Sequence, residues 1–174
     1  YSKEIILKIN ELGHEIGYHY ETLSDSKGDY KEAINLFGRQ IDKFNRLTKI
    51  NTVSMHGSSM SRYNNLEMWD HCLLSDFDLT GEAYLSIDWN NFCYFTDAGG
   101  SWNSNANLRD KSLLLNDFCR AVESTDELIK LISQNSNFYI NIHPDRWNDG
   151  ISWYIEAITK KIRNRGKLAY YKIF

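Results

Sequence analysis

The sequence predicts an α/β fold with a mainly parallel sheet. Short apolar runs typical of strands alternate with longer amphipathic segments typical of helices. Several of these strands end in a histidine or an aspartate, and α/β folds collect their chemistry at the carboxyl ends of parallel strands. With 174 residues, of which 42% are hydrophobic, the chain is long enough to form one core. We therefore expect a single domain over residues 1–174.

The chain opens on a helix, because four apolar residues share one helical face: Ile5, Ile6, Ile9 and Leu12. Gly13 is suited to end this helix. The next residues, 13–21, read Gly-His-Glu-Ile-Gly-Tyr-His-Tyr-Glu and predict a short buried strand that ends near His19 and Glu21. Gly17 allows another backbone to come close to this strand.

A second helix is predicted over residues 30–47. Asp29, with Glu32 three residues later, is a capping-box-like start. The residues expected to face inward then follow at helical spacing: Ile34, Phe37, Ile41 and Phe44. A short strand over 50–55 follows and leads into a loop that begins at His56.

The remaining pattern continues the alternation, except that residues 103–123 are ambiguous. Ser124 and Glu127 form another capping box, which opens a helix. We expect the final helix, from about residue 149 to 165, to bury four isoleucines: Ile151, Ile155, Ile158 and Ile162. The other expected elements are a helix at 65–73, strands at 79–87, 92–96 and 138–142, and a loop at 97–102.

Charge and cysteine content narrow the function classes. A net charge of -3 with mixed signs offers no basic stripe for phosphates, so nucleic acid is not an expected partner. The cysteines are odd in number and widely spaced, at 72, 93 and 119, which predicts reduced thiols and a cytoplasmic location. No apolar run approaches the length of a membrane span, so we expect no membrane-spanning segment.

Aromatic residues are abundant, with five tryptophans and eleven tyrosines. Such rings stack on sugar faces while their polar edges hydrogen-bond hydroxyl groups. Packing within an aromatic-rich core explains them equally well, so both interpretations stay open.

Three of the five histidines, His19, His56 and His143, follow predicted strands, and Asp97 ends a fourth. A lone histidine is more often structural, but this coincidence favours a metal or acid/base site. We expect the four side chains to lie on one face of the sheet. By contrast, His14 is expected to be structural and His71 to lie on a helix surface.

The stretch Gly13-His14-Glu15-Ile16-Gly17, followed by Tyr18-His19, resembles the second motif of the NodB-type polysaccharide deacetylases. Thr96-Asp97 with Trp102 is similar to the fourth motif of that family, and Ile142-His143 to the fifth. These enzymes are carbohydrate esterases built on a distorted (β/α) barrel. The resemblance covers most of the chain and implies an incomplete or distorted barrel. It also implies metal-dependent removal of acyl groups from a sugar or cell-surface glycan.

The resemblance also implies roles for individual residues. His19 would bind a divalent metal, with zinc the expected ion, and His56 would replace the family's second histidine, where this chain has Leu23. His143 would protonate the leaving group while Asp97 orients it. The residues expected to contact the sugar are Tyr20, Glu21, Trp102, Arg146 and Trp147. For Glu21 a solvated loop position, and for Trp102 and Trp147 loop packing, stay open as alternatives.

Two departures from the family pattern accompany this resemblance. Residues 55–58 do not match the family's third motif, and its paired aspartates, a general base and a metal ligand, would lie upstream of Tyr1. We therefore expect either that an N-terminal strand is missing or that this is a natural partial barrel. We expect no appreciable deacetylase activity from these 174 residues. The alternative function is a non-catalytic carbohydrate-binding or scaffold protein related to the family.

Overall fold

The computed structural model describes residues 2–57, 61–97, 102, 122–134 and 137–144, and positions 155, 158, 159, 162, 165 and 166. The chain divides into two compact units, Tyr1–Ile87 (unit 1) and Asp88–Phe174 (unit 2). Each unit is described by itself. The expectation of a single domain stays a prediction.

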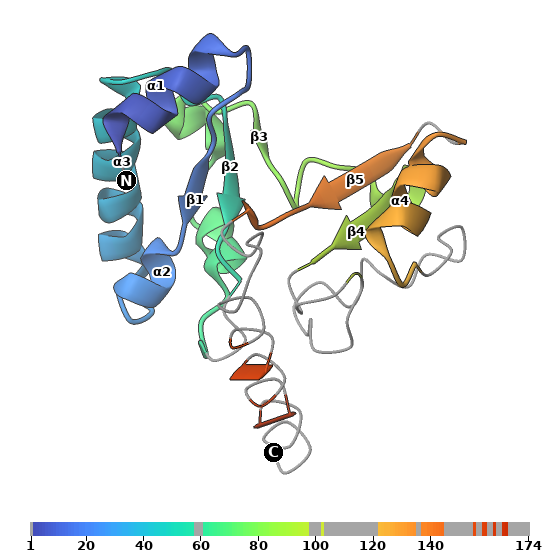
Figure 1. Ribbon diagram of the computed structural model, residues 1–174. Helices are drawn as coiled ribbons and strands as arrows, with labels where there is room; N and C mark the ends of the chain where they lie inside the picture. Colours follow the sequence, from blue (N-terminus) through green and yellow to red (C-terminus); the bar gives the residue numbers. More distant parts are fainter. Residues whose placement is uncertain are drawn as a thin grey trace. The chain divides into compact units, whose positions relative to one another are not determined.

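Unit 1 is built on a parallel sheet with the order β1-β2-β3 (Figure 1). Its strands are β1 (Tyr18–Tyr20), β2 (Thr52–Met55) and β3 (Gly81–Glu82). Because both pairings are parallel, the carboxyl ends of the three strands meet at one edge of the sheet. The predicted α/β class with parallel pairing is therefore confirmed.

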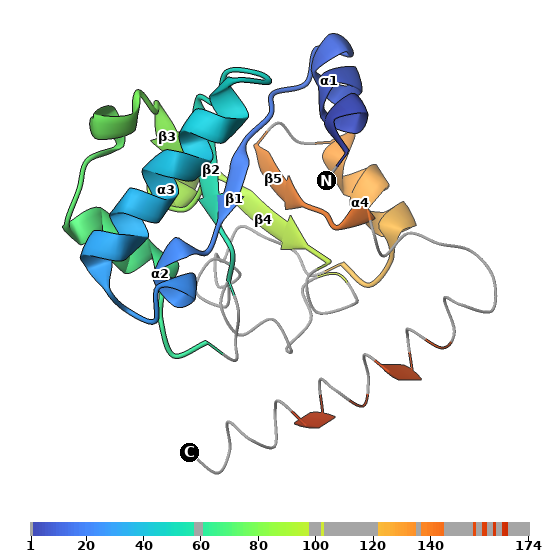
Figure 2. The ribbon, with the colours of Figure 1, turned by 90° about the vertical axis from the view of Figure 1, so that its left-hand side faces the viewer.

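Helices and helical turns cover this sheet. They are α1 (Lys3–Glu11), α2 (Thr22–Asp25), α3 (Tyr30–Asn45), η1 (Asn65–Asp70) and η2 (Leu74–Phe77). Figures 1 and 2 show α3 lying along one face of the strands. The predicted start of α3 is confirmed, because the Asp29 carboxylate accepts the backbone N–H of Glu32 at 3.0 Å.

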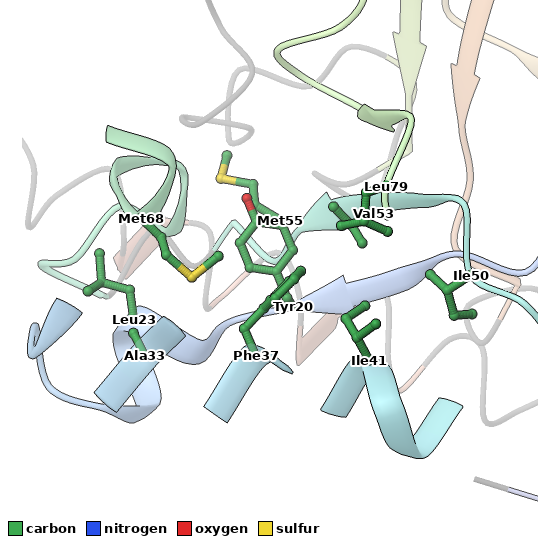
Figure 3. Packing of buried hydrophobic residues seen from close by; sticks show 10 residues of the cluster. All are labelled: Tyr20, Leu23, Ala33, Phe37, Ile41, Ile50, Val53, Met55, Met68 and Leu79. Carbon is green, nitrogen blue, oxygen red and sulfur yellow. The ribbon is translucent and has the colours of Figure 1, made fainter. Parts of the chain in front are cut away.

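The core of unit 1 lies between α3 and the sheet. Figure 3 shows Tyr20 and Phe37 at its centre, with ring centroids 5.3 Å apart and the rings edge to face. Ten buried residues form this cluster: Tyr20, Leu23, Ala33, Phe37, Ile41, Ile50, Val53, Met55, Met68 and Leu79. The apolar stripe of α1 is not part of it, since Ile5 and Leu12 stay 61% and 64% exposed.

Two glycines shape the entry to β1 as expected. Gly13 follows α1 with a φ of +85°, a conformation that favours glycine at a helix end. At Gly17, a Cβ atom would lie 3.2 Å from the carbonyl oxygen of Thr52, so the side chain of any other residue would press on β2.

Glu82 is a fully buried carboxylate that contacts all three strands of unit 1. Its Oε1 accepts the backbone N–H of Met55 at 2.9 Å and the hydroxyl of Tyr20 at 3.4 Å. Its Oε2 accepts the N–H groups of Tyr84 at 2.6 Å and Leu85 at 3.1 Å. Burial raises the pKa of Glu82, while these hydrogen bonds oppose the rise.

The same carboxylate explains why β3 is shorter than the strand predicted over residues 79–87. After Glu82 the backbone N–H groups of Tyr84 and Leu85 turn back to its side chain. They are therefore used in the turn and not in a ladder with β2.

Unit 2 contains a two-stranded parallel sheet of β4 (Cys93–Thr96) and β5 (Phe138–Asn141). It also contains η3 (Trp89–Asn91) and α4 (Thr125–Ile132). The Ser124 hydroxyl accepts the N–H of Glu127 at 3.2 Å, which confirms the predicted start of α4. A small core packs Phe95, Val122 and Leu128 together.

The strands of the described residues thus form two separate parallel sheets, and no closed barrel is present among them. The (β/α)-barrel interpretation stays a proposal. Within the same part of the chain, no helix is both long and apolar enough to cross a membrane.

Two expectations from the sequence are wrong. Of the four isoleucines expected to be buried, Ile155, Ile158 and Ile162 are 61%, 59% and 67% exposed and join neither core cluster of the described residues. Ile151 lies outside the described residues. Not all cysteines are reduced thiols, since Cys93 is disulfide-bonded. Cys72 is a free thiol whose pKa is raised to about 11 by burial and by Asp76. The cytoplasmic location stays an untested prediction.

We predict that Glu82→Gln lowers the free energy of unfolding by about 1–3 kcal/mol, the cost of leaving buried donors unpaired. Whichever way the new amide turns, its NH₂ faces a backbone N–H that now has no acceptor. Urea denaturation at pH 7 measures the change. Glu67→Gln, a matched change at an exposed site of η1, should leave the unfolding midpoint unchanged.

The pH dependence of stability tests the same carboxyl group. Folded Glu82 holds its proton to a higher pH than the unfolded chain, whose carboxyl titrates near 4.5. The contribution of Glu82 to the free energy of unfolding should therefore fall as pH rises from 4.5 through the raised pKa. This decline should be absent in Glu82→Gln, and an identical pH profile in the variant would contradict the assignment.

We also predict that Cys93 resists alkylation in the unfolded chain until a reductant is added, because its sulfur is in a disulfide. Peptide mass spectrometry after iodoacetamide treatment measures this. Cys72 is the control and should be labelled without a reductant. Labelling of both under the same conditions would show that Cys93 is a thiol.

Candidate functional site

Two histidines lie side by side at the carboxyl edge of the unit 1 sheet. The ring centroids of His19 and His56 are 5.1 Å apart, with the rings edge to face at 70°. His19 Nδ1 lies 3.0 Å from the carbonyl oxygen of Ser54, and His56 Nδ1 lies 2.5 Å from Oε2 of Glu21. Each ring is thus held through Nδ1 by an oxygen atom.

The strand register explains this placement. His19 is opposite Ser54 and Tyr20 is opposite Met55, so the residues after β1 and β2 leave the sheet together. The N–H of His56 donates to the carbonyl oxygen of Tyr20 at 2.6 Å, which extends the ladder by one step. The Asn65 side chain then donates to the His56 carbonyl at 3.0 Å and fixes the start of the loop.

A second carboxylate lies near this pair. Burial raises the pKa of Asp25, the negative charge of Glu21 raises it further, and His56 opposes the rise. The side chains of His56 and Glu21 are 46% and 45% exposed, so solvent and a ligand can reach them. The edge of unit 1 therefore combines two imidazoles with two carboxylates.

Unit 2 contains a second histidine–carboxylate pair, Asp97 and His143, directly after β4 and β5. Asp97 Oδ1 lies 2.5 Å from His143 Nδ1, and Oδ2 accepts the backbone N–H of His143 at 3.1 Å. The N–H of Asp97 donates to the carbonyl oxygen of Asn141 at 3.3 Å. The contact expected between Asp97 and His143 is present, with Asp97 13% and His143 31% exposed.

These contacts group the predicted catalytic and metal-binding residues into two sets, one in each unit. His19, His56 and Glu21 belong to unit 1, and Asp97 and His143 belong to unit 2. The expectation that all four histidine and aspartate side chains share one face stays a prediction.

Tyr20 requires a correction, because it was expected to contact a sugar. Its side chain is fully buried, accepts the indole N–H of Trp69 at 2.7 Å, and has a raised pKa caused mainly by burial. Successive residues of a strand point to opposite faces, so exposed His19 implies that Tyr20 points to the core. Tyr20 is a core residue.

The other residues expected in the sugar groove differ in outcome. Trp102 is half-buried, packs against the small core of unit 2, and donates its indole N–H to Thr125 at 3.0 Å. This geometry supports the packing alternative. Glu21 is paired with His56, and Arg146 and Trp147 lie outside the described residues.

The described part of the unit 1 edge provides fewer converging donors than a stable zinc site uses. Among the described residues, no group of three or more His, Cys, Asp or Glu side chains is arranged to hold a metal ion. Stable zinc sites use three or four protein ligands. Leu23, at the position of the family's second histidine, is 1% exposed and packs in the core, so this position faces away from solvent.

An open hollow of about 630 Å³ lies at the opposite, amino edge of the unit 1 sheet. Ile16, Thr52 and Thr80, which precede or begin the three strands, contribute to its walls with His14 and Lys49. None of the predicted site residues that the structure describes lines it. His14 is exposed there, and His71 is exposed next to the ring of Tyr30, as expected for a surface position.

Sequence reasoning missed Glu82, Asp25 and Ser54. A single carboxylate inside the apolar segment around Leu79–Tyr84 was the available signal for Glu82, because buried carboxylates are rare unless paired. Asp25 and the carbonyl of Ser54 carry no such signal, since their roles depend on the register between β1 and β2.

No protein family, curated protein or solved structure matches the chain.

We predict that zinc binds weakly to these 174 residues, because two imidazoles alone give an incomplete coordination shell. Calorimetric titration with zinc should show no sharp one-to-one endpoint, and His19→Ala should remove what binding there is. Tight stoichiometric binding that His19→Ala abolishes would show that a further ligand completes the site.

Proposed function

We propose that the protein removes acyl groups from a sugar or cell-surface glycan. His143 transfers a proton to the leaving group, and Asp97 orients the His143 ring. One observation carries this proposal: Asp97 engages both the backbone N–H and the ring Nδ1 of His143. A carboxylate that fixes an imidazole in this way is a recurring arrangement in acid/base catalysis. The motif resemblance around His19, Asp97 and His143 adds the sugar substrate.

The hydrogen bond assigns a role to each nitrogen of His143. An ionised carboxylate only accepts hydrogen bonds, so Nδ1 carries the proton that Asp97 binds. Nε2 is then the atom that exchanges a proton with the substrate. Asp97 also faces the positive charge that the ring acquires when Nε2 is protonated.

In the proposed reaction, water adds to the acyl carbon, and the bond from that carbon to the sugar nitrogen or oxygen breaks. His143 Nε2–H supplies the proton that the leaving atom takes up, and the proton that the attacking water loses restores Nε2–H by way of solvent, so the reaction balances. General acid catalysis alone contributes about 10²- to 10⁴-fold, which is less than enzymes supply for such reactions. The rest requires activation of the water. We assign no step to a metal ion, although a divalent ion near His19 and His56 stays part of the family expectation.

A non-catalytic carbohydrate-binding function is the second candidate. It is favoured by the burial of Leu23, which puts a core residue where the family has a metal ligand. Glu21, the nearest carboxylate to His19 in sequence, is already bound to His56. Such a protein would retain the affinity for glycans without the turnover.

We predict that a version of the chain extended upstream by an aspartate-bearing strand releases acetate from an acetylated oligosaccharide and that His143→Ala lowers its kcat/KM by about 10²- to 10⁴-fold. Asp97→Asn should also lower it, because the single amide oxygen cannot accept from both the backbone N–H and Nδ1–H of His143, as the two carboxylate oxygens do. His14→Ala, a matched change at the amino edge of unit 1, is the control and should retain activity.

Turnover that survives His143→Ala would contradict the proposed role of this residue. An inactive extended version that still binds the oligosaccharide in a calorimetric titration would favour the non-catalytic function. Activity of the 174 residues alone would show that they already contain the water-activating group.

A further inference from the structure

We propose that Glu21 is a positioning residue that holds His56 in its Nδ1–H tautomer, so that Nε2 is the acceptor nitrogen offered to a sugar hydroxyl. This inference deepens the proposed function, and it rests on that function in taking a sugar as the ligand. The tautomer itself follows from the geometry of unit 1 alone.

The contact between Glu21 and His56 decides the tautomer. A glutamate carboxylate at neutral pH accepts hydrogen bonds and cannot donate them. At 2.5 Å from Glu21 Oε2, the Nδ1 atom of His56 must therefore be the donor. In a neutral imidazole the other nitrogen, Nε2, is then an acceptor.

The same reasoning applies to the neighbouring ring. His19 Nδ1 lies 3.0 Å from the backbone carbonyl oxygen of Ser54, which also only accepts. His19 and His56, with ring centroids 5.1 Å apart, thus share one tautomer. In its neutral form His56 therefore presents Nε2 as an acceptor at the carboxyl edge of unit 1, which suits a hydrogen-bond donor such as a sugar hydroxyl group.

Two acceptors hold the Nδ1 atoms of these rings: the Ser54 carbonyl for His19 and the Glu21 carboxylate for His56. Only the Glu21 carboxylate can be removed by mutation. The Ser54 carbonyl belongs to the β1–β2 ladder, whereas Glu21 lies beyond β1 and reaches His56 through its side chain. Asp25 is also close enough for its charge to interact with His56. A comparison of the two carboxylates therefore separates a directional hydrogen bond from the effect of nearby negative charge.

The test is long-range ¹H–¹⁵N NMR of the histidine rings in the 174-residue chain, at a pH above the imidazole titrations that the same spectra report. His56 should show the Nδ1–H pattern. Glu21→Ala should lose this pattern in favour of the Nε2–H form, whereas Glu21→Gln should keep it because the amide oxygen still accepts. Asp25→Asn and Glu15→Ala, the latter at the other end of β1, are the controls and should leave His56 unchanged.

An Nε2–H pattern for His56 in the unmutated chain would overturn the proposal, and so would an unchanged pattern in Glu21→Ala. Loss of the pattern in Asp25→Asn as well would attribute the effect to charge and would also overturn it. Because the tautomer is read without substrate, a negative result here is distinguishable from an absence of deacetylase activity.

Discussion

The buried carboxylate of Glu82 is the interaction on which unit 1 depends. It accepts hydrogen bonds from Tyr20 at the end of β1, from Met55 at the end of β2, and from the turn after β3. A buried carboxylate is costly unless its oxygens are paired, and here both of them are. The strands β1, β2 and β3 are only three, four and two residues long, so few backbone hydrogen bonds join them. The Glu82 side chain therefore contributes much to fixing their alignment.

The alignment of β1 and β2 by Glu82 has a consequence for the candidate site. With Tyr20 held in the core by Glu82 and Trp69, the preceding residue, His19, must point to the opposite face. The same register brings His56 out next to it, where Glu21 binds its ring. Alternate residues of β1 thus face the core and the candidate site. Unit 2 repeats the chemistry, since Asp97 and His143 follow two paired parallel strands.

Local sequence signals predicted part of this structure well. Three features are recognisable because each depends on neighbouring residues. They are the Asp29 cap, the apolar face of α3, and the histidines within β1 and just after β2 and β5. The burial of Glu82 had a local signal, but the partners that it joins were not predictable, since Met55 and Tyr20 are 27 and 62 residues away in the chain. The prediction that Tyr20 contacts a sugar was wrong because the sequence shows only that neighbouring strand residues point to opposite faces. Which of the two faces is buried depends on how the helices pack on the sheet. The isoleucines at 155, 158 and 162 form an apolar stripe but are exposed. An apolar stripe in the sequence predicts a buried face only where another surface packs against it.

We propose that a sugar binds beside Asp97 and His143, and NMR chemical-shift mapping with an N-acetylated oligosaccharide tests this most directly. The ligand should shift the resonances of these two residues, and a shift of His56 and Glu21 is the corresponding expectation for unit 1 taken by itself. Thr52, Thr80 and Lys49, around the hollow at the amino edge of unit 1, should not respond. Shifts confined to that hollow, or no shifts at saturating ligand, would contradict the proposal.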